Sequence, residues 1–324
     1  MRVVFRFDAN DQIGHGHLMR SSVLARRLAA RGHQVELLSH GIPESLQAHL
    51  QGVRLHRAQT VGEDLEILSG LNHSRDVDWL VVDHYGIDAD WETQARSAAH
   101  RILVIDDLAN RLHDCDALLD QNICNPHQSA YRELLPGHCQ QWLGMAHLLA
   151  RASFYHDSCD ERRGLLVFLG GGNHRQALNG LLQDMVPDAL EPIEVLLTSA
   201  YGPVQALQPL ASGRYKPVFH VDLHDTAPLC RRVAGAVIRC GFMAYELALV
   251  GTPMVIIHAT PIQTEVALAL QAAGYAVALS EEKLADRDSL TTALTALREL
   301  RPKPMNQIHS PGAEHVAQLM ERFQ

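Results

Sequence analysis

The sequence predicts an α/β protein with two doubly wound domains, each built on a parallel β-sheet. Short runs rich in Val, Ile and Leu alternate with longer segments whose apolar residues recur at helical spacing. The strand-like runs are continuously apolar, which is typical of parallel strands buried on both faces. A charged patch near residues 150 to 163 interrupts the alternation, which then restarts, so we expect domains over residues 1–155 and 156–324. Tandem domains of this kind place a ligand cleft between them.

The first half of the chain predicts five strands and two clear helices. The strand-like runs are RVVFRF (2–7), QVELLS (34–39), WLVVDH (79–84), RILVIDD (101–107) and ALLDQN (117–122). The segment 17–32 carries Leu24 and Leu28 at helical spacing and stops at Gly32, a residue type that commonly ends helices. A second helix is expected over residues 89–100.

The second half repeats the pattern with five more strands. These are LLVFL (165–169), IEVLLTSA (193–200), PVFHVD (217–222), GAVIRC (235–240) and PMVIIHA (253–259), with helices between them. A last helix is expected over about residues 311–322, and it is a candidate for packing back onto the first domain.

Composition and charge exclude several classes of protein. The 324 residues are 47% apolar and 20% charged, as in globular proteins with a sizeable core. A formal net charge of −9 without long basic runs argues against nucleic-acid binding and against polybasic membrane contact. No apolar run approaches the roughly 18 residues of a membrane span, and the first residues lack the apolar region of a signal peptide. The six cysteines form no C-x-x-C pair. We therefore expect a cytoplasmic protein with reduced thiols and no membrane insertion, and leave its oligomeric state open.

A turn rich in glycine and histidine, DANDQIGHGHLMRSS (8–22), joins the first strand to the first helix. Gly14 and Gly16 allow close approach to a ligand, but the third glycine and the acidic partner of the dinucleotide-binding pattern are missing. No carboxylate or thiol nearby completes a metal set with His15 and His17. We therefore expect neither cofactor nor metal. Either histidine could act as a general base toward water; the alternative for His17 is a helix-start residue that satisfies a loop carbonyl.

Polar residues also lie at the ends of the last three strands predicted in the first half. They lie in VVDHYGID (81–88), IDDLANR (105–111) and LLDQN (118–122). Because the carboxyl ends of parallel strands meet at one edge of a sheet, where ligands bind in open α/β folds, these groups are expected to lie together. The sequence therefore predicts a polar pocket of the size of a sugar. The alternative is that one or two of the aspartates only cap helices.

Two segments of the second half are candidates for nucleotide binding. The first is FLGGGNHRQA (168–177), a glycine turn that leads into a helix and suits a phosphate or a domain contact. The second covers residues 238–270, where two strand–helix units follow each other. A helix start there would hold a diphosphate, Glu246 could accept ribose hydroxyls, and Gln263 begins the next helix. The alternative for Glu246 is a carboxylate that only the helix dipole favours.

These motifs together resemble those of a known family. The segments RFDANDQIGHGHLMR (6–20), LVVDHYGID (80–88), VIDDLANR with HDCDALLDQN (104–122) and FLGGG (168–172) look like the UDP-2,4-diacetamido-2,4,6-trideoxy-β-L-altropyranose hydrolases of pseudaminic acid biosynthesis. The likeness covers about residues 1–280 and is closer in the N-terminal motifs. The family belongs to the GT-B superfamily, so the resemblance implies two Rossmann-like domains, the first on the sugar side and the second binding the nucleotide.

The resemblance also implies a metal-independent reaction in which water attacks the anomeric carbon with inversion and releases UDP. It selects His17 as the general base, because His15 falls at a variable position of the family. Around the sugar it places Arg6, Asp8, Gly14, Gly16, Arg20, Tyr85, Asp107 and Asn122. Around the nucleotide it places Gly171, Gly172, Leu223, Gly241, Phe242, Met243, Glu246 and Gln263, with Leu223 where the backbone of the family meets uracil.

The phosphate loop departs from the family pattern. Where relatives carry a GGST-like loop, this chain has Cys240-Gly241-Phe242-Met243-Ala244, which retains backbone N–H groups but has no hydroxyl donors. Two alternatives to the UDP-sugar hydrolase therefore stay open. One is a GT-B glycosyltransferase in which an acceptor hydroxyl replaces water, and the other is a non-catalytic protein that binds a nucleotide sugar.

Overall fold

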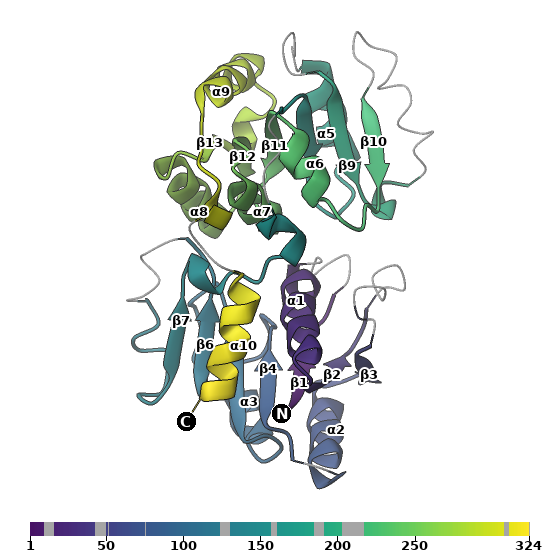
Figure 1. The fold of residues 1–324 in the computed structure, drawn as a ribbon, viewed down its shortest axis with the longest axis vertical. Helices are drawn as coiled ribbons and strands as arrows, with labels where there is room; N and C mark the ends of the chain where they lie inside the picture. Colours follow the sequence, from purple (N-terminus) through teal and green to yellow (C-terminus); the bar gives the residue numbers. More distant parts are fainter. Residues whose placement is uncertain are drawn as a thin grey trace. The chain divides into compact units, whose positions relative to one another are not determined.

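The computed structural model describes residues 1–9, 16–42, 50, 52–74, 76–123, 130–156, 161–184, 191–202, 217–307 and 311–323. The chain forms two compact units (Figure 1). The N-terminal unit contains Met1–Ala150 together with Ser310–Gln324, and the C-terminal unit contains Arg151–His309. The division thus falls after Ala150 rather than after residue 155, and the end of the chain returns to the N-terminal unit.

The N-terminal unit is built on a parallel sheet of seven strands in the order β3-β2-β1-β4-β5-β6-β7. Its strands are β1 (Arg2–Arg6), β2 (Gln34–Ser39), β3 (Arg54–Arg57), β4 (Trp79–Val82), β5 (Arg101–Ile105), β6 (Ala117–Asp120) and β7 (Gln140–Leu143). Its helices are α1 (Gly16–Ala30), α2 (Val61–Ser74), α3 (Ala89–Ala95), the 3-10 turn η2 (Met145–His147) and α10 (Gly312–Arg322). The order brings β1, β4, β5 and β6 side by side, so the polar segments that follow them share one sheet edge.

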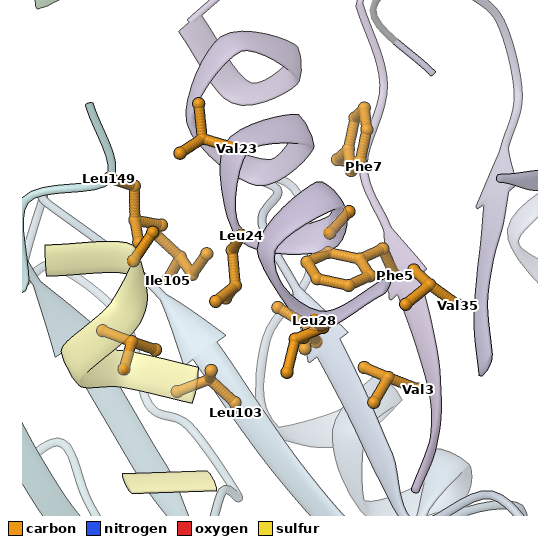
Figure 2. Close-up of a cluster of buried hydrophobic side chains, with 14 of the residues drawn as sticks. Val3, Phe5, Phe7, Val23, Leu24, Leu28, Val35, Leu103, Ile105 and Leu149 are labelled. Carbon is orange, nitrogen blue, oxygen red and sulfur yellow. The ribbon is translucent and has the colours of Figure 1, made fainter. Parts of the chain in front are cut away.

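The core of this unit lies on both faces of the sheet, as the continuously apolar strands predict. Figure 2 shows Leu24 and Leu28 of α1 gathered with Phe5 of β1 and Leu103 of β5. Each of these side chains is at most 1% exposed. A second cluster on the other strand face includes Val4, Leu80 and Trp91. Burial of each large apolar side chain contributes about 1.5–3 kcal/mol, so the two clusters hold the sheet edge rigid.

Helix α10 completes the N-terminal unit by packing against α1 and η2. Arg31, directly after α1, donates to Glu314 at 2.7 Å and also pairs with Glu321. At the start of α10 the backbone comes very close to the segment after η2, because a Cβ built on Gly312 would lie 2.4 Å from both the N and the O of Leu148. Position 312 therefore requires glycine.

Replacing Gly312 by Ala is expected to lower the free energy of unfolding by about 1–3 kcal/mol, because the added methyl overlaps backbone atoms that cannot yield without moving the helix. Gly70→Ala is the matched control, since nothing lies within 4 Å of a Cβ there and the residue is inside α2. Gly70→Ala should raise the free energy of unfolding by about 0.5–1 kcal/mol. Urea unfolding measures this free energy for both variants, and an equal change in the two would contradict the close contact at Gly312.

The C-terminal unit has a parallel sheet of six strands in the order β10-β9-β8-β11-β12-β13. Its strands are β8 (Leu165–Phe168), β9 (Ile193–Leu197), β10 (Val218–Val221), β11 (Gly235–Arg239), β12 (Met254–His258) and β13 (Ala276–Ser280). Its helices are α5 (Arg175–Asp184), α6 (Ala227–Arg232), α7 (Phe242–Val250), α8 (Pro261–Ala272) and α9 (Arg287–Glu299). Short 3-10 turns are η3 (Ala152–Tyr155), η4 (Ser199–Tyr201), η6 (Glu281–Lys283) and η7 (Met305–Gln307).

The prediction of two parallel α/β sheets is confirmed, and every strand predicted from the sequence forms. Three strands were not predicted, β3, β7 and β13, and each lies at the edge of its sheet. β3 reads RLHR and β7 reads QQWL, so neither has the continuous apolar run that marks a central strand. Four cysteines lie in the described residues and form no disulfide there, namely Cys115, Cys139, Cys230 and Cys240. Within the described residues, no helix is both long and apolar enough to cross a bilayer.

Candidate functional site

His17 is the second residue of α1 and lies at the carboxyl edge of the N-terminal sheet. Its neighbour Gly16 is exposed, whereas His17 itself is only 4% exposed. Gly14 and His15, the other candidates in the turn, lie outside the described residues. The side chain that the sequence selected as a base is therefore held in the protein interior and not on a free loop.

The imidazole of His17 contacts a buried carboxylate. Its Nδ1 lies 2.5 Å from Oδ1 of Asp83, which follows β4 and is fully buried. The Asp83 carboxylate can only accept, so Nδ1 carries a proton and donates it to Asp83. Arg20 Nη2 also lies 3.2 Å from Nδ1, but Nη2 donates to Asp83 Oδ1 at the shorter distance of 2.6 Å. In the neutral ring the lone pair is then on Nε2. Among the described residues, none forms a hydrogen bond with that Nε2. His17 is thus oriented to accept a proton at Nε2.

Arg20 and Ser21, one turn further along α1, hold the same carboxylate. The guanidinium donates from Nη2 to Oδ1 of Asp83 at 2.6 Å and from Nε to Oδ2 at 2.9 Å, and the Ser21 hydroxyl donates to Oδ2 at 2.7 Å. Burial alone would raise the pKa of Asp83, but the charge of Arg20 and the hydrogen bonds from His17 and Arg20 hold that pKa well below its usual range. Asp83 is therefore an anion that fixes the ring of His17.

Tyr85 and Asp107 lie beside this group. The ring of Tyr85 meets the imidazole of His17 edge to face, with centroids 4.5 Å apart and an angle of 71° between the planes. Tyr85 as a whole is 43% exposed. Desolvation of its hydroxyl raises the pKa of Tyr85, and the negative charge of Asp107 raises it further, so the phenol keeps its proton. Asp107 accepts from Arg20 Nη1 at 2.7 Å through Oδ2, and its Oδ1 has no hydrogen-bond partner in the described part of the chain.

Arg6 and Asp8 form a separate buried network at the end of β1. Arg6 Nε donates to Asp64 at 2.8 Å, and its Nη1 lies 2.9 Å from Oδ1 of Asp8. Asp8 also accepts from the hydroxyl of Ser39 at 3.0 Å and from the backbone N–H of His40 at 2.7 Å. These contacts lie inside the unit and support the chain after β1.

Asn122, the last residue predicted around the sugar, follows β6 and is 8% exposed. Its backbone N–H donates to Oδ1 of Asp120 at 2.9 Å, while the Tyr131 hydroxyl donates to Asp106 at 3.0 Å. Asp106 and Asp120 are thus held within the unit. Of the carboxylates at the four strand ends, Asp83 contacts His17 directly and Asp107 is linked to it through Arg20.

In the C-terminal unit, Glu246 of α7 is 3% exposed and forms an ion pair with Arg151. Arg151 donates to Oε1 from Nη2 at 2.8 Å and from Nε at 3.1 Å, and it also donates to Thr226 Oγ1 at 2.6 Å. Burial raises the pKa of Glu246, and the Arg151 charge opposes that rise. No described residue donates to Oε2. The sequence analysis did not assign Arg151, because only the fold reveals its contact with α7.

The start of α7 presents backbone donors without a side-chain cap. Gly241 is the N-cap, and its carbonyl accepts from Ala244 N–H at 3.0 Å. The N–H groups of Phe242 and Met243 have no acceptor among the described residues. Helix starts of this kind bind anions through such N–H groups.

The other residues predicted around the nucleotide differ in whether they already form hydrogen bonds within the unit. Gln263 takes part in the capping box of α8, where Oε1 accepts from the N-cap Thr260 N–H at 3.4 Å and also from Ala259 N–H at 3.0 Å. Leu223 follows β10 and is 38% exposed, and no described residue bonds to its backbone. In the glycine turn, the carbonyl of Gly171 accepts from Thr198 Oγ1 at 2.6 Å, whereas Gly172 lies beside the His174 ring. The described residues include no group of three or more His, Cys, Asp or Glu placed to hold a metal ion.

Comparison with curated proteins confirms the resemblance inferred from the motifs. No protein-family model matches the chain. The chain is 28% identical over 175 residues to the UDP-2,4-diacetamido-2,4,6-trideoxy-beta-L-altropyranose hydrolase of Campylobacter jejuni subsp. jejuni serotype O:2. The alignment covers 53% of this chain and 61% of that protein, so the chain spans about three fifths of its curated relative.

Solved structures confirm the GT-B fold. Acinetobacter baumannii MurG has a TM-score of 0.61 at 16% identity, with 100% of both chains covered. The spinosyn rhamnosyltransferase SpnG complexed with thymidine diphosphate has a TM-score of 0.61 at 13% identity, covering 99% of each chain. S. aureus MnaA, solved with UDP, has a TM-score of 0.62 at 9% identity, covering 99% of this chain and 96% of that one. At these identities the likeness concerns the fold alone.

Proposed function

We propose that this chain is a UDP-sugar hydrolase that releases UDP and a free 2,4-diacetamido-2,4,6-trideoxyhexose, as a step in nonulosonic (pseudaminic) acid and surface polysaccharide biosynthesis. The observation that carries this proposal is the pair formed by buried His17 and Asp83, which leaves Nε2 as a proton acceptor. The activity for which the Campylobacter relative is named supports the choice of substrate.

In the proposed reaction, His17 Nε2 accepts a proton from water while the water oxygen attacks C1 of the sugar. The C1–O bond breaks, its electron pair leaves with UDP, and the configuration at C1 inverts. His17 becomes an imidazolium, and the Asp83 carboxylate at 2.5 Å from Nδ1 stabilises the new charge. A general base of this kind raises the reaction rate about 10²–10⁴-fold. No step uses a metal ion.

On the sugar side, Tyr85 and Asp107 are proposed to bind polar groups of the substrate. The phenol of Tyr85 is a protonated donor beside the His17 ring, and Oδ1 of Asp107 is an acceptor without a partner in the described residues. Arg20 links this pair to Asp83. Arg6 and Asp8 are proposed to act indirectly by shaping the chain after β1, and Asn122 remains a predicted sugar contact.

On the nucleotide side, Oε2 of Glu246 is proposed to accept hydrogen bonds from the ribose hydroxyls, while Oε1 accepts from Arg151. The N–H groups of Phe242 and Met243 are proposed to receive the diphosphate, and the backbone of Leu223 the uracil. Gln263 supports this site through its contact with the Cys240 carbonyl at 3.3 Å.

The direct test of hydrolysis is incubation with the UDP-sugar in the absence of any acceptor. Release of free sugar and UDP in equal amounts is expected, and NMR during the first turnovers should show the inverted anomer. A glycosyltransferase would instead release sugar only after an acceptor is added. Binding without turnover under either condition would support the non-catalytic alternative and overturn the proposal.

Glu246→Gln should weaken UDP binding about 10- to 100-fold, because a hydrogen bond to a charged group contributes about 1.5–3 kcal/mol. Titration with UDP and with 2′,3′-dideoxy-UDP checks the cause. The wild-type protein should prefer UDP, and the variant should lose most of that preference. Equal UDP affinity for the variant and the wild-type protein would rule out the ribose contact.

A further inference from the structure

Two side chains that the proposed function does not use, one arginine and one histidine, lie at the carboxyl edge of the C-terminal sheet. Strands β8 and β11 are parallel neighbours, with Phe168 paired to Ile238, so the segments that follow them start side by side. Arg239 is the last residue of β11, shortly before the N-cap of α7. His174 follows the glycine turn after β8. The fold therefore brings Arg239 and His174 to the same edge as the start of α7.

The contact between these two side chains determines the tautomer of His174. Arg239 Nη1 lies 3.0 Å from Nδ1 of His174. A guanidinium can only donate, so Nδ1 accepts and the neutral ring carries its proton on Nε2. Burial and the Arg239 charge lower the pKa of His174, which favours this neutral form.

The Nε2–H group of His174 lies over the glycine turn. A Cβ built on Gly172 would be 3.4 Å from Nε2, and one built on Gly170 would be 3.6 Å away. No described residue accepts a hydrogen bond from this nitrogen. Neither glycine carries a side chain, so at these two positions only backbone lies beside the donor.

Arg239 also has a partner that a ligand could replace. Its Nη2 contacts Glu281, the first residue of η6, whose side chain is 42% exposed. Exposed ion pairs contribute only about 0–1 kcal/mol. A phosphate group also matches the planar guanidinium with a bidentate set of acceptors. Replacing Glu281 by a phosphate therefore costs little.

We infer that Arg239 and His174 form a side-chain clamp for the diphosphate of a bound nucleoside diphosphate. Arg239 supplies the charge and a forked pair of donors, and His174 supplies Nε2–H from the side of the glycine turn. The clamp replaces the hydroxyl donors that the Cys240–Ala244 segment lacks, beside the backbone N–H groups at the start of α7. This inference rests on the proposed function, since it deepens the assignment of the nucleotide side.

Calorimetric titration of the full chain with UDP and with uridine tests the clamp. Arg239→Gln and His174→Gln should each lower UDP affinity about tenfold, as expected for the loss of one hydrogen bond to a charged group. Both variants should bind uridine within twofold of wild type, which also shows that the site is folded. Arg163→Gln, at an exposed arginine of the same unit, is the matched control and should leave both affinities unchanged.

The outcomes separate this inference from the proposed function. Unchanged UDP affinity in Arg239→Gln would overturn the clamp alone, and an equal loss of uridine affinity would do the same by showing a general structural effect. If the wild-type protein binds UDP and depends on Arg239 but releases no sugar, the clamp stands and the hydrolase is overturned. A wild-type protein that binds no UDP would overturn both.

Discussion

His17→Ala should lower the rate of UDP-sugar hydrolysis about 10²–10⁴-fold, the range expected when a general base is removed. UDP affinity should stay within twofold, because His17 lies in the N-terminal unit and is assigned to the attacking water. Steady-state kinetics and UDP titration on the same preparations measure the two effects.

The matched control for this substitution is His100→Ala, which changes an exposed histidine of the same unit and should leave kcat unchanged. Thermal unfolding of both variants shows whether the fold is intact. Turnover by His17→Ala within a few-fold of the wild-type rate would mean that another group accepts the proton.

Asp83→Asn is expected to have the second large effect, a loss of kcat of about 10²–10⁴-fold. The Asn amide can present its NH₂ group to Nδ1, which favours the tautomer with a proton on Nε2 and removes the lone pair that accepts from water. The same substitution in a Ser-His-Asp triad lowers kcat about 10⁴-fold for this reason. KM should change far less than kcat, because Asp83 contacts His17 and not the substrate.

Ser21→Ala distinguishes orientation of His17 from general packing. It removes one hydrogen bond to Asp83 Oδ2 and leaves the contact between Asp83 and His17 in place. We expect it to lower kcat less than tenfold, since a neutral hydrogen bond contributes about 0.5–1.5 kcal/mol. If Asp83→Asn and Ser21→Ala had the same effect on kcat, Asp83 would have no special role in the base.

The fold was predictable because its central strands are buried on both faces and therefore read as continuous apolar runs. β1 and β11 are examples, with four or more buried residues in a row. The edge strands β3 and β7 lack that pattern, since one side of an edge strand has no neighbour to bury it. The place of His17 at the start of α1 could also be predicted, from the glycine turn that precedes a helical apolar pattern.

The contacts of the candidate site depend on the fold and could be predicted only in part. Asp83 was visible as a polar residue at a strand end, but its partner His17 is 66 positions away in the sequence. Arg6, predicted as a sugar contact, forms a buried ion pair with Asp64 that the sequence does not reveal. Gln263, predicted at the nucleotide, also caps the helix that it begins. In each case the sequence supplies the residue type, and only the packing decides which neighbour it meets.

Hydrolysis in H₂¹⁸O is the most direct test of water attack at C1 with His17 as the base. The wild-type protein is incubated with the UDP-sugar without acceptor, and both products are analysed by mass spectrometry. Attack at C1 puts ¹⁸O into the free sugar and none into UDP, and His17→Ala should lose this labelled product. Label in the phosphate of UDP would place the attack at phosphorus, and unlabelled, unreacted substrate would contradict hydrolysis altogether.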